Sequence, residues 1–138
     1  MKNKDSIFVD TSGFKALIDE KDEFHKEAVN IWKNLSQTDV LIVTTNYILD
    51  ETFTLLRAKC GIGFVLEFRT YLIKSAPIIK LERVTSKDEA NAWNWFAKDW
   101  SKLSFTDCVS FALMNRLNIK KTFTFDKHFA KAGFLLER

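Results

Sequence analysis

The chain has 138 residues, which is the size of one domain, so we expect residues 1–138 to form a single domain. Its 46% hydrophobic and 28% charged residues exclude a disordered or fibrous protein, and four Gly and one Pro are too few for a turn-rich β-sandwich. The net charge of +3 is compatible with a polyanionic partner. No apolar run approaches the roughly 20 residues that span a bilayer. Cys60 and Cys108 form no metal or redox spacing, so we expect a cytoplasmic protein with free thiols and no membrane association.

Short apolar segments of strand type alternate with segments of helical periodicity along the chain. In chain order, the pattern predicts a strand at 6–9, helices at 14–18 and 22–35, a strand at 41–43, helices at 47–59 and 64–73, a strand at 78–81, helices at 86–100 and 105–117, a strand at 122–125, a short helix at 127–131 and a strand at 134–136. Such alternation is typical of an α/β fold. We expect a parallel-stranded central sheet flanked by helices on both faces, an α/β/α sandwich.

The helix expected at 86–100 has a start signal and an aromatic stripe. Residues 86–89 read Ser-Lys-Asp-Glu, which fits a capping box. Trp93, Phe96 and Trp100 lie at helical steps, and this spacing favours the core or a dimer interface over base stacking. Trp95 points elsewhere on the same helix, so we expect it to be exposed.

Four acidic residues occupy related positions in this pattern. Asp10 and Asp126 each follow a predicted strand directly, Glu51 lies early in the helix after the second strand, and Asp107 lies in the first turn of its helix. Ligands of open α/β sheets collect at the carboxyl ends of the strands, and the helices after those strands begin at the same edge. We therefore expect the four carboxylates to converge.

Taken singly, each acid has an ordinary structural explanation. Asp10 and Asp126 can be helix N-caps, Asp107 can complement a helix dipole, and Glu51 can be a solvated helix residue with Asp50 beside it. A cluster is different, because two unit charges 4 Å apart repel by about 4 kcal/mol at an effective dielectric of 20. Clustered acids therefore take up protons or bind cations. Oxygen ligands favour Mg²⁺ or Mn²⁺, which activate water for attack on phosphorus.

The segments around these acids resemble the four motifs of the PIN-domain family, and their order and spacing are similar to VapC-type toxin ribonucleases. The resemblance runs from about Ile7 to Leu136. It is carried by Phe8-Val9-Asp10-Thr11-Ser12, Asn46-Tyr47-Ile48-Leu49-Asp50-Glu51-Thr52, Leu103-Ser104-Phe105-Thr106-Asp107 and Phe123-Thr124-Phe125-Asp126-Lys127-His128-Phe129.

This resemblance implies a PIN-like fold and a Mg²⁺- or Mn²⁺-dependent endoribonuclease that acts as the toxin of a toxin–antitoxin module. It implies an RNA substrate, an antitoxin protein as partner, and homodimers. The metal-binding and catalytic acids that it implies are Asp10, Glu51, Asp107 and Asp126. Hydroxyl groups at Thr11 or Ser12 and at Thr124 match positions that support those acids, and His25 matches a structural position.

Two alternatives remain open from the residues: a PIN-like module that binds RNA or protein without cleaving it, and a receiver-like Mg²⁺-binding signalling domain. The receiver reading requires an Asp after the middle strand, where residues 80–82 read Lys-Leu-Glu. An Asp-x-Asp phosphatase is disfavoured because Ser12 occupies the place of the second acid.

Three further features receive ordinary structural interpretations. His25 and His128 lack a third ligand in the pattern, so no zinc site is expected. Cys108 adjoins Asp107 without a nearby base motif, which is typical of a small packed residue. The lysines at 120, 121 and 127 are expected to be solvated, with phosphate contact as the second choice.

Overall fold

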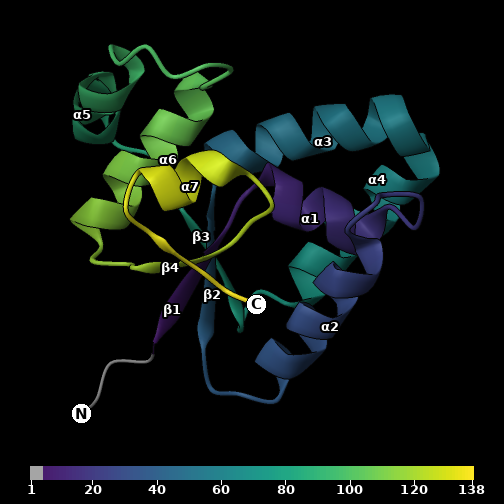
Figure 1. Cartoon of the computed structure of the whole chain (residues 1–138). Helices are drawn as coiled ribbons and strands as arrows, with labels where there is room; N and C mark the ends of the chain where they lie inside the picture. Colours follow the sequence, from purple (N-terminus) through teal and green to yellow (C-terminus); the bar gives the residue numbers. More distant parts are fainter. Residues whose placement is uncertain (1–4) are drawn as a thin grey trace.

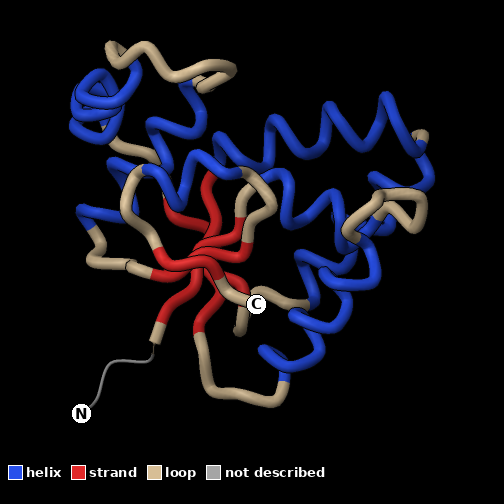
Figure 2. The backbone as a smooth tube through the Cα atoms, viewed as in Figure 1, coloured by secondary structure: helices blue, strands red, loops and turns tan. Residues whose placement is uncertain are grey.

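A parallel sheet forms the centre of the computed structural model, which describes residues 5–138 (Figures 1 and 2). In this part of the chain the strand order is β3-β2-β1-β4-β5, and every neighbouring pair is parallel. The strands are β1 (Ser6–Val9), β2 (Leu41–Thr45), β3 (Ile79–Glu82), β4 (Lys121–Phe123) and β5 (Leu135–Leu136). The predicted parallel sheet is confirmed.

Helices cover both faces of this sheet. They are α1 (Thr11–Ile18), α2 (His25–Ser36), α3 (Asn46–Cys60), α4 (Ile62–Lys74), α5 (Ser86–Phe96), α6 (Phe105–Arg116) and α7 (Lys127–Lys131). The chain steps from β1 to β2 to β3 through α1–α4, then reverses direction and reaches β4 and β5 through α5–α7. Right-handed crossovers place these two groups on opposite faces, and Figure 1 shows them on opposite sides of the strands. The predicted α/β/α sandwich is therefore confirmed.

Helix α6 is the most deeply buried helix, because α5 and α7 contact it on the side away from the strands. Every residue from Asp107 to Met114 is buried. Phe111 packs edge-on against Phe129 of α7, with ring centroids 4.9 Å apart. Successive residues of a helix point to different sides, so a continuous buried run needs neighbouring elements on more than one side. The burial of α6 also fixes the position of Asp107 in its first turn.

The predicted capping box of α5 is wrong by one residue. Thr85 is the N-cap: its Oγ1 accepts a hydrogen bond from Asp88 N at 3.2 Å, and Asp88 Oδ2 accepts one from Thr85 N at 3.0 Å. Arg116 of α6 donates to both carboxylate oxygens of Asp88, at 2.8 and 2.9 Å. Glu89, the expected partner, instead accepts a hydrogen bond from the Tyr47 hydroxyl.

The aromatic residues near α5 also differ from expectation. The helix ends at Phe96, so Trp100 lies in the following loop and stacks on His128. Trp95, expected to be exposed, packs against Phe111 of the core at a centroid distance of 5.6 Å. Trp93 is 56% exposed and is not a core residue. Trp93 and Phe96 do share a face of α5 and contact each other, but this face is exposed, and a role in a dimer interface stays a prediction.

Both cysteines are free thiols: Cys60 is half-buried and Cys108 is buried. Burial, and next the charge of Asp107, raises the pKa of the Cys108 thiol to about 11, which agrees with a packed and unreactive residue. Within residues 5–138, no helix combines the length and the apolar character needed to cross a membrane.

Candidate metal centre

The pairing of β1 with β4 brings the ends of the chain's first and fourth strands together. Val9 pairs with Phe123, so Asp10 and Thr124 leave the sheet side by side. Helix α1 then passes very close to β4. A Cβ atom added at Gly13 would lie 2.6 Å from the carbonyl oxygen and from a ring carbon of Phe123. Glycine at this position therefore permits α1 to start directly beside the acid that follows β4.

Asp10 is buried and held by three donors. Its Oδ1 accepts hydrogen bonds from Gly13 N at 2.9 Å and Ser12 Oγ at 2.8 Å, and its Oδ2 accepts one from Thr124 Oγ1 at 2.8 Å. Burial raises the pKa of Asp10 to about 6, against these hydrogen bonds and with a smaller contribution from the charge of Asp126. Asp10 is thus both the N-cap of α1 and a member of a charged cluster.

These contacts show which of the expected hydroxyl groups bind the Asp10 carboxylate. Ser12, rather than Thr11, donates to the carboxylate, and Thr124 donates from the other side. The Thr11 hydroxyl instead accepts a hydrogen bond from Thr52 at 3.3 Å. Thr124 Oγ1 also accepts from the backbone N–H of Asp126 at 3.0 Å, so one hydroxyl group links two acids.

The pKa of Asp107 is raised further than that of Asp10. The side chain that caps α6 is Ser104, whose Oγ accepts a hydrogen bond from Asp107 N at 3.0 Å. The carboxylate of Asp107 is therefore not the cap of its helix. Burial first, then the charges of Asp126 and Asp10, raise its pKa to about 8. The cluster has negative charge that the surrounding protein does not compensate, which is the condition under which a carboxylate site binds a cation.

Asp126 caps α7 and lies beside a histidine that the motif analysis did not assign to the site. Asp126 Oδ1 accepts a hydrogen bond from His128 N at 2.9 Å. The imidazole Nδ1 of His128 lies 2.8 Å from the same oxygen and 3.9 Å from Asp107 Oδ2. The sequence signal for His128 was Asp-Lys-His at a helix start. A side chain in the first turn lies next to the N-cap residue of the same helix.

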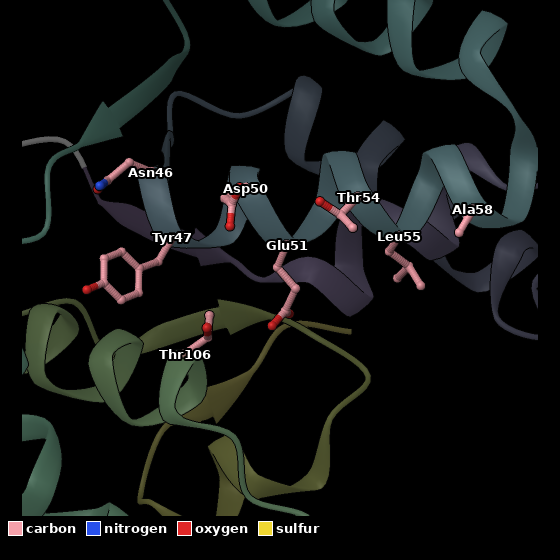
Figure 3. Close-up of a pocket in the computed structure, with 8 residues that line it drawn as sticks. All are labelled: Asn46, Tyr47, Asp50, Glu51, Thr54, Leu55, Ala58 and Thr106. Atoms are coloured by element: carbon pink, nitrogen blue, oxygen red, sulfur yellow. The ribbon is translucent and has the colours of Figure 1, made fainter.

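Glu51 reaches the cluster from α3, which begins directly after β2 with Thr45 as N-cap. A cavity of about 380 Å³ is lined by Asp10, Glu51, Asp107 and Asp126 together. Glu51 is exposed, and Figure 3 shows its side chain extending from α3 toward α6, which carries Thr106. All four acids predicted from the sequence therefore face one cavity.

A second, larger cavity of about 790 Å³ adjoins the first, and the two share Glu51 and Leu55 (Figure 3). Asp50, which competed with Glu51 in the sequence pattern, lines only this second cavity. The two neighbouring acids of α3 thus differ in position, and Glu51 is the one that faces Asp10, Asp107 and Asp126.

The lysines that line the acidic cavity are not those considered from the sequence. Lys15 contacts Asp19 at 3.1 Å and Asp22 at 2.8 Å, and Lys102 lies in the loop before α6. Lys121 begins β4, so it lies at the opposite end of that strand from Asp126. Lys102 was missed because its placement depends on a loop, and Lys15 was missed because helical spacing alone did not single it out on α1.

The donor atoms of this site suit a divalent cation. Ligand atoms of Asp107, Asp126 and His128 lie within 4.8 Å of one another, and the buried Nδ1 of His128 has no hydrogen-bond partner among the described residues. Carboxylate oxygens favour Mg²⁺ and Mn²⁺. The elevated pKa of Asp107 supports the same conclusion from electrostatics. The residues present therefore fit the metal that the motif resemblance implied.

His25 has a different environment. Its Nδ1 lies 2.9 Å from the carbonyl oxygen of Ala16, so it links the start of α2 to α1. This contact agrees with the structural role expected for His25.

A parallel five-stranded sandwich with four acids at one strand edge is the arrangement of PIN domains, and the chain belongs to this family: the PIN domain model matches residues 7–135. The chain is 35% identical over 130 residues to the Mycobacterium tuberculosis protein named 23S rRNA-specific endonuclease VapC20, in strains CDC 1551 / Oshkosh and H37Rv. The alignment covers 94% of this chain and 95% of that protein. The resemblance to VapC-type proteins is confirmed.

The similarity extends to a solved structure. A crystal structure of Mycobacterium tuberculosis VapC20, described as a sarcin–ricin loop cleaving toxin, matches with a TM-score of 0.82. The match covers 94% of this chain and 96% of that one at 35% identity. The two proteins therefore share the PIN fold over nearly their whole lengths.

Proposed function

We propose that this chain is a metal-dependent endoribonuclease and the toxin of a toxin–antitoxin module, with residues 1–138 as one PIN-like domain. The observation that carries the proposal is the acid cluster around Asp107, whose pKa of about 8 reflects burial beside Asp126 and Asp10. Similarity to an endonuclease over 94% of the chain supports the same activity. The receiver-like alternative has no support in this family assignment.

In this proposal Asp10, Glu51, Asp107 and Asp126 hold Mg²⁺ or Mn²⁺ and form the catalytic site. A divalent ion held by these acids would supply positive charge for the phosphodiester and an activated water for its hydrolysis. The chain's own residues position the ligands: Ser12 and Thr124 fix the orientation of the Asp10 carboxylate through their hydroxyl groups. Pre-oriented ligands lose little freedom when they bind, which favours a defined geometry.

Lys15 and Lys102 line the same cavity and supply positive charge near the acids. We assign them the role of attracting the RNA backbone, because phosphate contacts dominate the affinity of nucleic-acid binding. Lys15 is paired with Asp19 and Asp22, which hold its ammonium group in place and offset its charge, so the attraction rests mainly on Lys102. The name of the relative indicates ribosomal RNA as the first substrate to test, and the sarcin–ricin loop as the first site.

We further propose a cytoplasmic homodimer that an antitoxin protein inhibits. The free thiols Cys60 and Cys108 agree with a reducing compartment. Helix α4 exposes large apolar side chains, with Ile62 at 52%, Leu66 at 53% and Ile73 at 62%. Exposed apolar groups gathered on one helix are typical of surfaces that bind another protein.

The proposal is tested with purified full-length chain and ribosomal RNA in Mg²⁺ or Mn²⁺. We expect cleavage that EDTA abolishes and either ion restores, and that Asp10→Asn lowers by at least about 100-fold. Asp50→Asn is the matched control, because Asp50 lines only the second cavity, and it should cleave like the wild type. Undiminished cleavage in EDTA contradicts the mechanism. RNA binding without cleavage in either ion favours the non-catalytic alternative.

A further inference from the structure

We propose that His128 is a further ligand of the metal centre and binds the ion through its imidazole Nδ1. This inference rests on the proposed metal-dependent function and deepens it. It starts from the geometry of α7, which begins right after Asp126 and brings the third residue, His128, back over its own N-cap. Nδ1 lies 2.8 Å from Asp126 Oδ1 and 3.9 Å from Asp107 Oδ2.

The environment of the other ring nitrogen determines what Nδ1 presents to the acids. Nε2 lies 2.8 Å from the carbonyl oxygen of Ser101. A carbonyl oxygen only accepts hydrogen bonds, so Nε2 has the proton and the neutral ring has its lone pair on Nδ1. A histidine whose second nitrogen donates to a backbone carbonyl is the usual form of a metal-binding histidine.

The lone pair of Nδ1 therefore faces two carboxylate oxygens. Nδ1 is buried and, among the described residues, has no hydrogen-bond partner, although it lies 2.8 Å from Asp126 Oδ1. A lone pair turned toward carboxylate oxygens is repelled by them, and a cation held by His128 together with these acids would remove that repulsion. Ligand atoms bound at about 2.1 Å are roughly 3 Å apart when adjacent and about 4 Å apart when opposite, and the separations of Nδ1 from the two oxygens, 2.8 and 3.9 Å, are close to these values.

The ring is also prevented from turning away. Trp100 stacks on it with an interplanar angle of 5° and a centroid separation of 6.5 Å. The ammonium group of Lys131, the last residue of α7, lies 4.6 Å from the centre of the Trp100 ring. Together with the Ser101 hydrogen bond, the stacking keeps Nδ1 directed at the acids. A ligand with a fixed direction contributes more to affinity than one that has to be ordered on binding.

A nitrogen ligand changes which ion the site prefers. Mg²⁺ favours oxygen ligands, while imidazole suits transition metals. We therefore expect the site to bind Mn²⁺ more tightly than Mg²⁺, and we expect His128→Asn to reduce this preference. Asn offers an oxygen in place of Nδ1, so His128→Asn should retain binding of Mg²⁺ while Mn²⁺ binding weakens roughly 10-fold or more.

The decisive experiment uses the full-length chain without an affinity tag, because the sequence then contains only two histidines, His25 and His128. Pulsed electron paramagnetic resonance of bound Mn²⁺ detects the nitrogen of a coordinating imidazole. We expect this nitrogen signal in the wild type and in His25→Gln. We expect it to disappear in His128→Asn, with calorimetry reporting the weaker Mn²⁺ binding. The wild type and His25→Gln decide the question even when a His128 variant fails to fold.

The outcomes separate this inference from the proposed function. Mn²⁺ binding that Asp107→Asn abolishes, without a nitrogen signal in the wild type, overturns the role of His128 and leaves the proposed metal site intact. A nitrogen signal lost in His25→Gln also overturns it. If the wild-type chain binds neither Mn²⁺ nor Mg²⁺, the proposed function fails together with the inference.

Discussion

Asp107 is an acidic residue in the most buried helix of the protein, although burying its carboxyl group is costly for folding. Ser104 already caps α6, so the carboxylate of Asp107 contributes nothing to that cap. Burial and the neighbouring charges of Asp126 and Asp10 favour its protonated form. In the folded chain without a cation, Asp107 therefore has a pKa of about 8, against about 3.9 for an unfolded chain.

This shift predicts how the stability of the metal-free protein depends on pH. Between about pH 4 and pH 8 the folded state binds more protons than the unfolded state, so the free energy of unfolding falls as pH rises and levels off above pH 8. Asp107→Asn removes the contribution of Asp107, leaves the smaller one of Asp10, and should be the more stable protein at pH 8, by about 1 kcal/mol or a few degrees in melting temperature. Thermal melts of both proteins in EDTA from pH 5 to 9 measure the difference.

The difference between the variant and the wild type should grow as pH rises through this window. It should reverse when Mn²⁺ is added, because only the wild type keeps the full ligand set and gains stability from binding. A variant that is less stable than the wild type at every pH, with an intact response to Mn²⁺, would show that Asp107 is structural.

The hydrogen bonds of Thr124 lead to a second prediction for a single residue. Thr124→Val removes the hydrogen bond to Asp10 and leaves the N–H of Asp126 without its acceptor. We expect a loss of about 1–2 kcal/mol in stability and several-fold weaker Mn²⁺ binding, since the hydrogen bond stabilises the charged form of Asp10. Calorimetric titration measures the binding.

Thr122→Val is the matched control, because Thr122 is equally buried on the same strand and donates to the carbonyl oxygen of Phe8 instead. It should lose comparable stability and keep the Mn²⁺ affinity of the wild type. Equal losses of affinity in the two variants would mean that β4 acts through general packing and not through the Thr124 hydroxyl group.

At the scale of elements, the close contact of α1 with β4 determines where Asp10 lies. Gly13→Ala places a methyl group 2.6 Å from the carbonyl oxygen of Phe123, which is backbone and cannot move aside easily. We expect a loss of about 1–3 kcal/mol and a displaced α1, with RNA cleavage reduced beyond the loss of folded protein. Chemical denaturation and cleavage assays well below the melting temperature test this.

Gly63→Ala makes the same substitution in α4, where no other atom lies within 4 Å of the added Cβ. It should stabilise the protein by about 0.4–1 kcal/mol, because it restricts the unfolded chain and favours the helix. A Gly13→Ala protein as stable as Gly63→Ala would mean that α1 does not depend on close contact with Phe123.

The order and type of the elements followed from the sequence, while their ends depended on contacts between distant residues. The Ser/Thr-x-x-Asp/Glu pattern fits both Thr85 and Ser86, and only the bonds from Arg116 to Asp88 favour the first. Helical spacing continues formally through Trp100, but its ring stacks on His128 and the chain turns at Lys102, with φ of 60°. Such tertiary effects have no local signature.

The candidate site was predictable to a similar degree. Parallel strands end at one edge, so the convergence of Asp10 and Asp126 followed from the alternation of strands and helices. The place of His128 depends on the short α7 and on Trp100, and that of Lys102 on a loop. Neither is fixed by periodicity. The residues that the sequence analysis missed are therefore those whose positions depend on loops and helix ends.

At the scale of the whole molecule, the prediction concerns how many copies of the chain assemble. Ile62, Leu66 and Ile73 expose apolar surface on α4, and we expect a homodimer at tens of micromolar. Light scattering of the full chain determines the mass, and Leu66→Glu should shift the population toward the monomer while the fold is retained. A wild-type monomer at that concentration, with no co-purifying partner from the native host, would contradict this proposal.

The strand order also has a consequence for synthesis on the ribosome. β1 lies between β2 and β4, and β4 with Thr124 and Asp126 is translated after every element from β1 to α6. A nascent chain that ends before Lys121 already contains Asp10, Glu51 and Asp107, but β1 lacks one of its two neighbours and Asp10 lacks the Thr124 hydroxyl. Long-range strand pairing of this kind forms late. The growing chain therefore has no complete form of the proposed metal site until residues 121–126 have left the ribosome.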